Sequence, residues 1–198
     1  MNHNAAFYDI KIVEMDKSIS SASDIYLLRR VASGDELAFG ELYQRYHGSI
    51  YNYVLRLIHE PKEAEDLLQE IFLAVWRGAH RFREQAQVKT WMYRIAHYQA
   101  ISWLRKHRPV TPFDDMTVIN LEVPEQVTFE TWQSDEVRKA INHLSPKHRA
   151  VLELAFVHGM AYGEIAQVVG CPVGTVKSRM SYALRVINGK LKAADFVS

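Results

Sequence analysis

The stretch AYGEIAQVVGCPVGTVKSRMSYAL, residues 161–184, constrains the fold more than any other part of the chain. Ala166 is small enough to let a second helix cross closely over the first. Gly170 follows four residues later and tolerates the positive φ that a tight turn requires. Apolar residues suited to locking such a pair together recur at helical spacing: Ile165, Val169, Cys171, Val176 and Met180. The stretch therefore predicts a helix-turn-helix.

The second helix of this pair carries positive charge with no acid beside it. A solvated helix usually mixes the two signs, because oppositely charged i,i+4 pairs stabilise it. With the apolar residues buried, its open side presents Gly174, Thr175, Lys177, Ser178, Arg179, Tyr182 and Arg185. In DNA-binding motifs of this kind, the second helix lies in the major groove, where Arg reads guanine and Lys, Ser and Thr hold phosphates. These residues are the predicted DNA contacts; an ordinary helical hairpin with a solvated basic face is the alternative.

A net charge of only +1 conceals charge that is segregated along the chain. Residues 77–108 hold eight Lys or Arg and one acid, and residues 171–192 hold five basic residues and no acid. Residues 109–136 lie between these blocks and hold seven acids with no Lys or Arg. Two basic blocks that are nearly free of acids indicate two surfaces for an anionic partner, although each block alone could be a solvated helix face.

The composition argues against several classes of protein. One cysteine, Cys171, excludes an internal disulfide and a cysteine-based zinc cluster, and it suits a reducing compartment. We expect it to be a small core residue of the turn, with a redox sensor as the alternative. No apolar run reaches the roughly 18 residues of a membrane span, and no signal peptide is evident. A cytoplasmic protein without membrane insertion is the expectation.

No motif of enzyme chemistry is present in the sequence. It contains no phosphate-binding glycine loop, no nucleophile elbow and no HExxH pair. None of the nine histidines is paired with cysteine at a metal-ligand spacing. We therefore expect no catalytic residue, no metal and no cofactor, and a protein that is not an enzyme.

Helical periodicity recurs along the chain, whereas no stretch alternates convincingly with a period of two. Asp35 and Pro61 mark the starts of two helices, and Gly34 marks the end of an earlier one. A fourth helix over residues 88–107 would turn Trp91, Ile95, Tyr98 and Ile101 or Leu104 inward. The fold class is therefore all-α: two small helical domains joined by a flexible acidic linker. The expected division is an arm at 1–23, a domain at 24–108, a linker at 109–133, a helix-turn-helix domain at 134–192 and a tail at 193–198.

Three segments, in this order, resemble the extracytoplasmic-function group of bacterial RNA polymerase sigma factors, in the sigma-70 family. They read AEDLLQEIFLAVW, TWMYRIAHYQAISWLRKHR and LSPKHRAVLELAFVHGMAYGEIAQVVGCPVGTVKSRMSYAL. The resemblance implies that residues 24–108 bind core polymerase and the −10 promoter element, and that residues 134–192 bind the −35 element. It also implies three partners: core RNA polymerase through its β and β′ subunits, promoter DNA, and an anti-sigma factor.

The resemblance assigns roles to particular residues of the first domain. Asp66, Gln69 and Glu70 lie at i, i+3 and i+4 and would dock on the polymerase clamp, with a solvated helix face as the alternative. The loop at 81–87 would receive a base flipped out of the −10 element. The predicted −10 contacts are Arg81, Arg83, Glu84 and Gln85 in the loop and Lys89, Arg94, Arg105, Lys106 and Arg108 along the next helix. Trp91 and Trp103 are candidates to stack on bases, with a place in the core as the alternative for Trp91. His97 and His107 are expected to be solvent-exposed, with DNA contact as the alternative.

The linker must reach between two promoter elements if this interpretation holds. Its 25 residues span at most about 85 Å when fully extended, and about 28 Å as a free coil. Two grooves that are two helical turns apart lie about 70 Å from each other. The sequence thus predicts a sigma factor that gives polymerase its promoter specificity and assists melting. A stand-alone helix-turn-helix regulator, which binds duplex DNA without polymerase, is the alternative.

Overall fold

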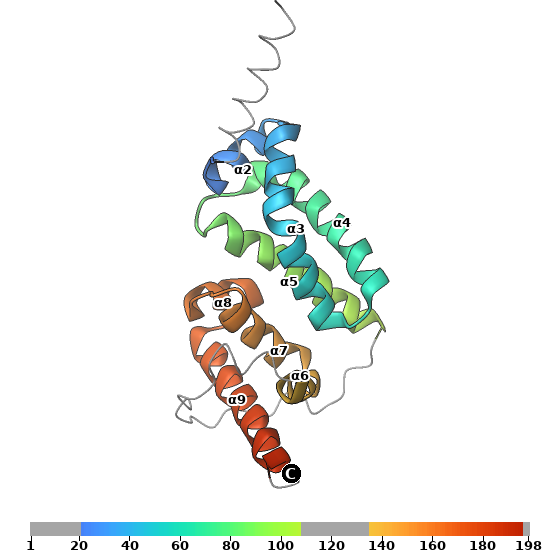
Figure 1. Cartoon of the computed structure of the whole chain (residues 1–198). Helices are drawn as coiled ribbons and strands as arrows, with labels where there is room; N and C mark the ends of the chain where they lie inside the picture. The colour runs from blue at the N-terminus through green and yellow to red at the C-terminus, as the bar shows by residue number, and fades with distance from the viewer. Residues whose placement is uncertain (1–20, 108–134, 196–198) are drawn as a thin grey trace, which may run out of the picture.

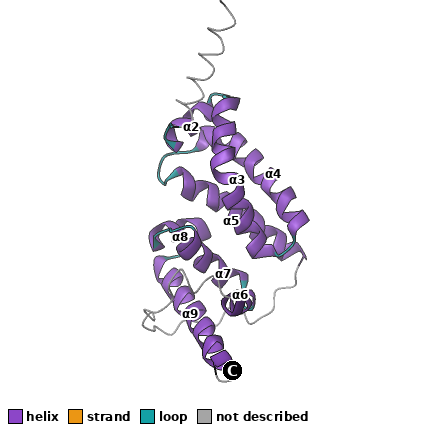
Figure 2. Ribbon diagram, viewed as in Figure 1, coloured by secondary structure: helices purple, strands orange, loops and turns teal. Residues whose placement is uncertain are grey.

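A computed structural model describes residues 21–107 and 135–195 of the chain. Every regular element in these two ranges is a helix, and the helices form two bundles that lie against each other (Figures 1 and 2). The all-α prediction is therefore confirmed. The predictions for the N-terminal arm, the linker, the tail and Arg108 fall wholly or mainly outside the described residues and remain predictions.

The first bundle is built from four α-helices and one short turn. They are α2 (Asp24–Ala32), α3 (Glu36–Ile58), α4 (Pro61–Gly78), the 3-10 turn η1 (Ala79–Arg81) and α5 (Val88–His107). Local sequence explains where the helices start. The Asp35 carboxylate accepts the Ala38 N–H at 3.0 Å and caps α3, and Pro61 occupies the first turn of α4. Both starts agree with the prediction.

The buried face of α5 is wider than the predicted one. Tyr98 is 44% exposed, and Trp91 is only half-buried. The buried residues on this helix are Val88, Thr90, Met92, Tyr93, Ala96, His97, Ala100 and Leu104. Of the residues predicted to face inward, Leu104 is buried and Trp91, Ile95 and Ile101 pack half-buried against the core, so only Tyr98 was wrong. The buried face is wider than predicted because α5 is covered on two sides, by α3 and α4 and by the second bundle. The buried stripe therefore includes polar side chains that hydrophobic periodicity does not reveal.

His97 shows this most clearly. It was expected to be solvent-exposed, but it is 7% exposed, and its Nδ1 lies 2.9 Å from the Tyr53 hydroxyl. Burial, together with the nearby charge of Arg179, lowers the pKa of His97 to about 4. A neutral histidine with one buried hydrogen-bond partner is therefore part of the domain core. His107, by contrast, is exposed as expected.

The second bundle contains α6 (Asp135–Asn142), α7 (Pro146–Leu152), the π-helical turn η4 (Glu153–Val157), α8 (Tyr162–Val169) and α9 (Val173–Asp195). Gly170 adopts a φ of 67° between α8 and α9, as predicted for the tight turn. Ile165, Val176 and Met180 are buried in the angle between these helices, and Val169 and Cys171 are half-buried there. The predicted helix-turn-helix is confirmed.

Candidate nucleic-acid interface

The start of α9 presents the residues that sequence analysis assigned to DNA. Gly174, Lys177, Tyr182 and Arg185 are exposed, while Thr175, Ser178 and Arg179 are half-buried. The guanidinium of Arg185 lies over the Tyr182 ring, 5.4 Å from its centroid, and that ring packs on His148. This stacking limits the conformations of Arg185 before any partner binds. All seven residues lie on the first four turns of one helix, as a recognition helix requires.

Arg179 differs from Lys177 and Arg185, which are exposed, because part of its surface is already covered. Its Nη1 lies 3.7 Å from the Sγ of Cys171, and its charge acts on His97 of α5. Burial raises the pKa of the Cys171 thiol, although Arg179 opposes the shift. A thiol held protonated in the turn is poorly suited to redox chemistry, which favours the packing role for Cys171.

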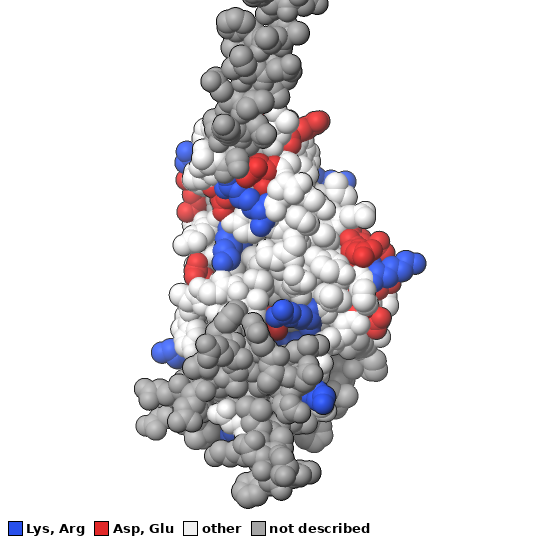
Figure 3. Space-filling model, in the orientation of Figure 1, with Lys and Arg blue, Asp and Glu red and all other residues white. Residues whose placement is uncertain are grey.

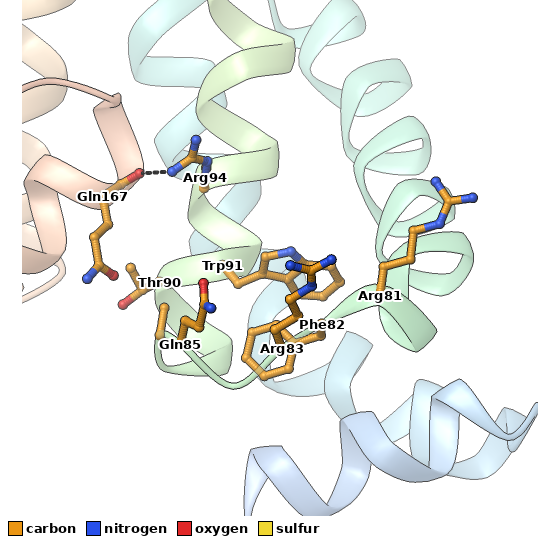
Figure 4. Close-up of a pocket in the computed structure, with 9 residues that line it drawn as sticks. Arg81, Phe82, Arg83, Gln85, Thr90, Trp91, Arg94 and Gln167 are labelled. Atoms are coloured by element: carbon orange, nitrogen blue, oxygen red, sulfur yellow. Dashed lines mark hydrogen bonds between the residues drawn. The ribbon is translucent and has the colours of Figure 1, made fainter.

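The loop before α5 frames an open pocket of about 400 Å³ (Figure 4). Its lining residues are Arg81, Phe82, Arg83, Gln85, Ala86, Thr90, Trp91, Arg94 and Gln167. The Phe82 and Trp91 rings lie 5.2 Å apart and provide an aromatic wall, and three arginines surround it. Aromatic faces with nearby cations are the features that bind unstacked bases and their phosphates. The sequence placed Arg81, Arg83 and Gln85 in this loop and Trp91 and Arg94 on the next helix, but it gave no sign of Phe82, Thr90 or Gln167.

Glu84 does not line this pocket. Its carboxylate accepts two hydrogen bonds from Arg29 of α2, from Nε to Oε1 and from Nη2 to Oε2, each 2.8 Å long. Glu84 also adopts a φ of 56°, which is uncommon for a residue with a side chain. The bidentate pair therefore anchors the loop in an unusual backbone conformation. Arg29 lies 55 residues earlier in the chain, and no local pattern pointed to it.

Replacing Arg29 with alanine is expected to loosen this loop. An exposed ion pair contributes about 1 kcal/mol at most, so we expect roughly a threefold loss of affinity for a fluorescent single-stranded oligonucleotide. Fluorescence anisotropy at constant salt measures the effect. The double variant Arg29→Ala/Glu84→Ala should lose no more than the single one, because one interaction is removed in both. A larger loss of affinity in the double variant than in Arg29→Ala would show that Glu84 contacts DNA directly.

The cations predicted along α5 fall into two groups. Lys89 donates to the backbone oxygen of His158 at 2.7 Å, and Arg94 donates to the backbone oxygen of Gln167 at 2.9 Å. Both acceptors belong to the second domain. Arg105 and Lys106 are exposed at the far end of the helix and make no such contact in the described residues. Arg105 and Lys106 are thus open to DNA, whereas Lys89 and Arg94 are hydrogen-bonded to the second domain.

Asp66, Gln69 and Glu70 are exposed together on α4, as their spacing predicted. Figure 3 shows acidic side chains grouped along the edge that α4 forms. Asp66 and Glu70 also line a groove of about 380 Å³ between α4 and α5, which Trp103 closes on the other side. The Trp103 Nε1 donates to Glu63 at 3.0 Å, so the indole is held at the groove by its own domain.

Within residues 21–107 and 135–195, no three His, Cys, Asp or Glu side chains are grouped so that they could hold a metal ion. In the same ranges, none of the helices combines the length and the apolar character needed to cross a membrane.

Comparison with known proteins agrees with this geometry. The family model described as Sigma-70 region 2 matches residues 42–110, and the model described as Sigma-70, region 4 matches residues 134–187. The first match contains the pocket loop, α4 and α5, and the second contains α8, the turn and most of α9. The two candidate DNA surfaces therefore fall in separately matched regions.

Relatives match over most of the chain. The RNA polymerase sigma-H factor of Pseudomonas aeruginosa is 33% identical over 186 residues, which are 88% of this chain and 96% of that protein. The ECF RNA polymerase sigma factor RpoE of Cereibacter sphaeroides is 34% identical over 76% of this chain and 84% of its own length. A solved complex of the sigma factor RpoE with the anti-sigma factor NepR from Bartonella quintana has a similar fold. Its TM-score is 0.60 at 24% identity, with 78% of this chain and 96% of that chain covered.

Proposed function

The chain belongs to the extracytoplasmic-function group of the sigma-70 family, and on that premise we propose that it directs core RNA polymerase to specific promoters and helps to melt them. One observation carries the proposal: a single chain presents a recognition helix for duplex DNA and an aromatic, arginine-lined pocket suited to an unstacked base. A protein that only bound duplex DNA would need the first of these features and not the second.

Each surface has a distinct task under this proposal. The exposed start of α9 reads the −35 element, with Arg179 toward base edges and Lys177 and Arg185 toward phosphates. Extruding a base costs a few kcal/mol of unstacking, which stacking on the aromatic wall and hydrogen bonds from the loop would offset. Asp66, Gln69 and Glu70 on α4 dock on the polymerase.

The protein catalyses no reaction of its own, because polymerase performs the synthesis and the sigma factor supplies binding energy and position. It acts in the cytoplasm, where polymerase and promoter DNA are found. Because the RpoE factor of Bartonella quintana was solved with the anti-sigma factor NepR, we expect an anti-sigma factor for this chain as well.

Binding to core RNA polymerase is the direct test of the proposed function. The double variant Asp66→Ala/Gln69→Ala is expected to bind purified core polymerase about tenfold more weakly, since it removes two polar side chains from the docking surface. Titration of labelled protein with core polymerase measures the change. A matched control, Glu36→Ala/Gln44→Ala, removes an exposed acid and an exposed amide from α3 and should bind normally.

The same titration discriminates against the alternative function. If the wild-type chain shows no affinity for core polymerase and binds a promoter duplex tightly by itself, the protein is a stand-alone regulator. If the control variant weakens binding as much as the α4 variant, the docking surface lies elsewhere.

A further inference from the structure

We propose that a second pocket, between the end of α4 and the middle of α5, binds the nucleotide next to the flipped base on the same single strand of DNA. The pocket has a volume of about 540 Å³, and its lining includes Glu70, Leu73, Arg77, Gly78 and Arg81 from α4 and η1 and Gln99 from α5. This volume falls within the range of about 300–1,000 Å³ that is usual for small-ligand pockets. The proposal rests on the function proposed above and extends it from one captured base to two neighbouring nucleotides.

The second pocket adjoins the pocket framed by the loop before α5 (the loop pocket). Arg81 lines both of them. The Trp91 indole separates them, because it packs on Phe82 in the loop pocket and its far edge lies against Gly78, where a Cβ would come within 3.2 Å of the ring. Figure 4 shows Arg81 on one side of the Trp91 ring and Gln167 on the other. Two nucleotides that follow each other on one strand can therefore occupy the two pockets on either side of this ring.

Positive charge lies at the end of the second pocket that faces the loop pocket. Arg77 and Arg81 are four residues apart, and both are exposed. In the part of the chain that the structure describes, neither of them forms an ion pair. Arg81 donates from Nε to the neighbouring His80 ring at 3.2 Å, which leaves its terminal N–H groups for another acceptor. The phosphate that joins two nucleotides in the two pockets must pass this point, and guanidinium groups bind phosphate with two parallel hydrogen bonds.

Negative charge lies at the opposite end of the second pocket. Glu70 is exposed on the same face of α4, two turns before Arg77 and about 10 Å from it along the helix axis. Its carboxylate would repel a phosphate, so the base and not the backbone lies at this end. An ionised carboxylate only accepts hydrogen bonds, and it therefore favours a base with an exocyclic amino group, such as cytosine, over thymine.

The middle of the second pocket suits the ring of a base. Leu73 is 51% exposed there and offers an apolar surface, while the half-buried Gln99 amide can both donate and accept at a base edge. An exposed leucine by itself is ordinary. Here it lies between two cations and a carboxylate, in the order of the phosphate, the ring and the amino group of one nucleotide.

A side chain of core polymerase is the competing occupant, because Glu70 is also a predicted docking residue. Asp66 and Gln69, which the docking variant changes, lie outside the second pocket. Binding of DNA in this pocket and binding of polymerase to α4 can therefore be separated by different substitutions.

Arg77→Gln tests the phosphate contact. We expect it to bind a fluorescent single-stranded oligo-dC about fivefold more weakly, because a charge-assisted hydrogen bond is lost. The slope of log K against log salt should also become shallower by about 0.7, the value for one phosphate of a single strand. Fluorescence anisotropy across a salt series measures both quantities. The matched control Lys62→Gln removes an exposed cation from the start of the same helix and should change neither.

Glu70→Gln tests the base contact by comparing oligo-dC with oligo-dT in the same assay. The wild-type ratio of the two affinities includes the preference of the loop pocket, so the change in that ratio on substitution is the quantity measured. We expect the preference for oligo-dC to fall about fivefold, because the glutamine amide can donate to O4 of thymine whereas the carboxylate cannot. Glu65→Gln removes an exposed acid of α4 that lies outside the pocket, and it should leave the ratio unchanged.

Three results would overturn the second nucleotide site. One is wild-type affinity and salt dependence in Arg77→Gln, and another is an unchanged oligo-dC to oligo-dT ratio in Glu70→Gln. The third is a loss of affinity for core polymerase in Arg77→Gln with no loss for oligo-dC, which would assign the pocket to the polymerase. Failure of the proposed function is a separate result, because there the wild-type chain itself would not bind core polymerase.

Discussion

Arg149→Met is expected to lower the free energy of unfolding of the C-terminal domain by about 3–5 kcal/mol. Within that domain, the Arg149 guanidinium donates to the backbone oxygens of Asn142 and Leu144 at 3.0 and 2.9 Å, and to that of Ile141 at 3.3 Å. These carbonyls end α6 and begin the turn to α7. Methionine fills a similar volume but donates nothing, so the carbonyls are left buried without partners.

Hydrogen exchange measured by mass spectrometry on the full chain locates the damage. Amides of α6 and α7 should exchange more than a hundredfold faster, as a loss of about 3 kcal/mol requires, while most amides of α3 and α4 should be little affected. The control Lys139→Met removes an exposed cation from the same domain and should leave exchange unchanged. Normal exchange at α6 and α7 in Arg149→Met would show that the carbonyls are satisfied by water and that Arg149 does not support the domain.

Arg149 illustrates what the sequence could and could not predict. The helix starts at Asp35 and Pro61 and the turn at Gly170 were predictable, because each depends on one residue and its near neighbours. Arg149 lies in a helical pattern where a basic side chain is usually solvated, and its partners Arg56 and Leu57 are more than 90 residues away. No periodicity encodes such a contact.

The same distinction holds for the candidate site. Residues on one face of one helix, such as Lys177 and Arg185, were predictable from spacing alone. The pocket was predictable only in part, because two of its contacts join segments that only the folded chain brings together. Phe82 packs on Trp91 to form the aromatic wall, and Arg29 binds Glu84 and anchors the loop. The burial of His97 on α5 was missed for a related reason, since the second domain covers part of this helix.

Arg179→Ala is expected to weaken binding of the polymerase complex to its promoter by about 2 kcal/mol, roughly 30-fold, because a bidentate Arg–guanine pair contributes that much discrimination. Arg179 is half-buried beside Cys171 and near His97. The alanine variant should retain normal affinity for core polymerase, since the predicted docking surface lies on α4.

Arg185→Ala provides the matched comparison on the same helix. Arg185 is exposed and stacked over Tyr182, in the position expected of a phosphate contact. Its loss should weaken binding evenly across DNA sequences and reduce the slope of log K against log salt by about one. Arg179→Ala should instead relax the preference at one base pair of the −35 element, which competition among single-base promoter variants measures. If Arg179→Ala reduces polymerase affinity and promoter affinity equally, α9 is not a separate DNA-reading surface, and the proposed division of labour between α4 and α9 is wrong.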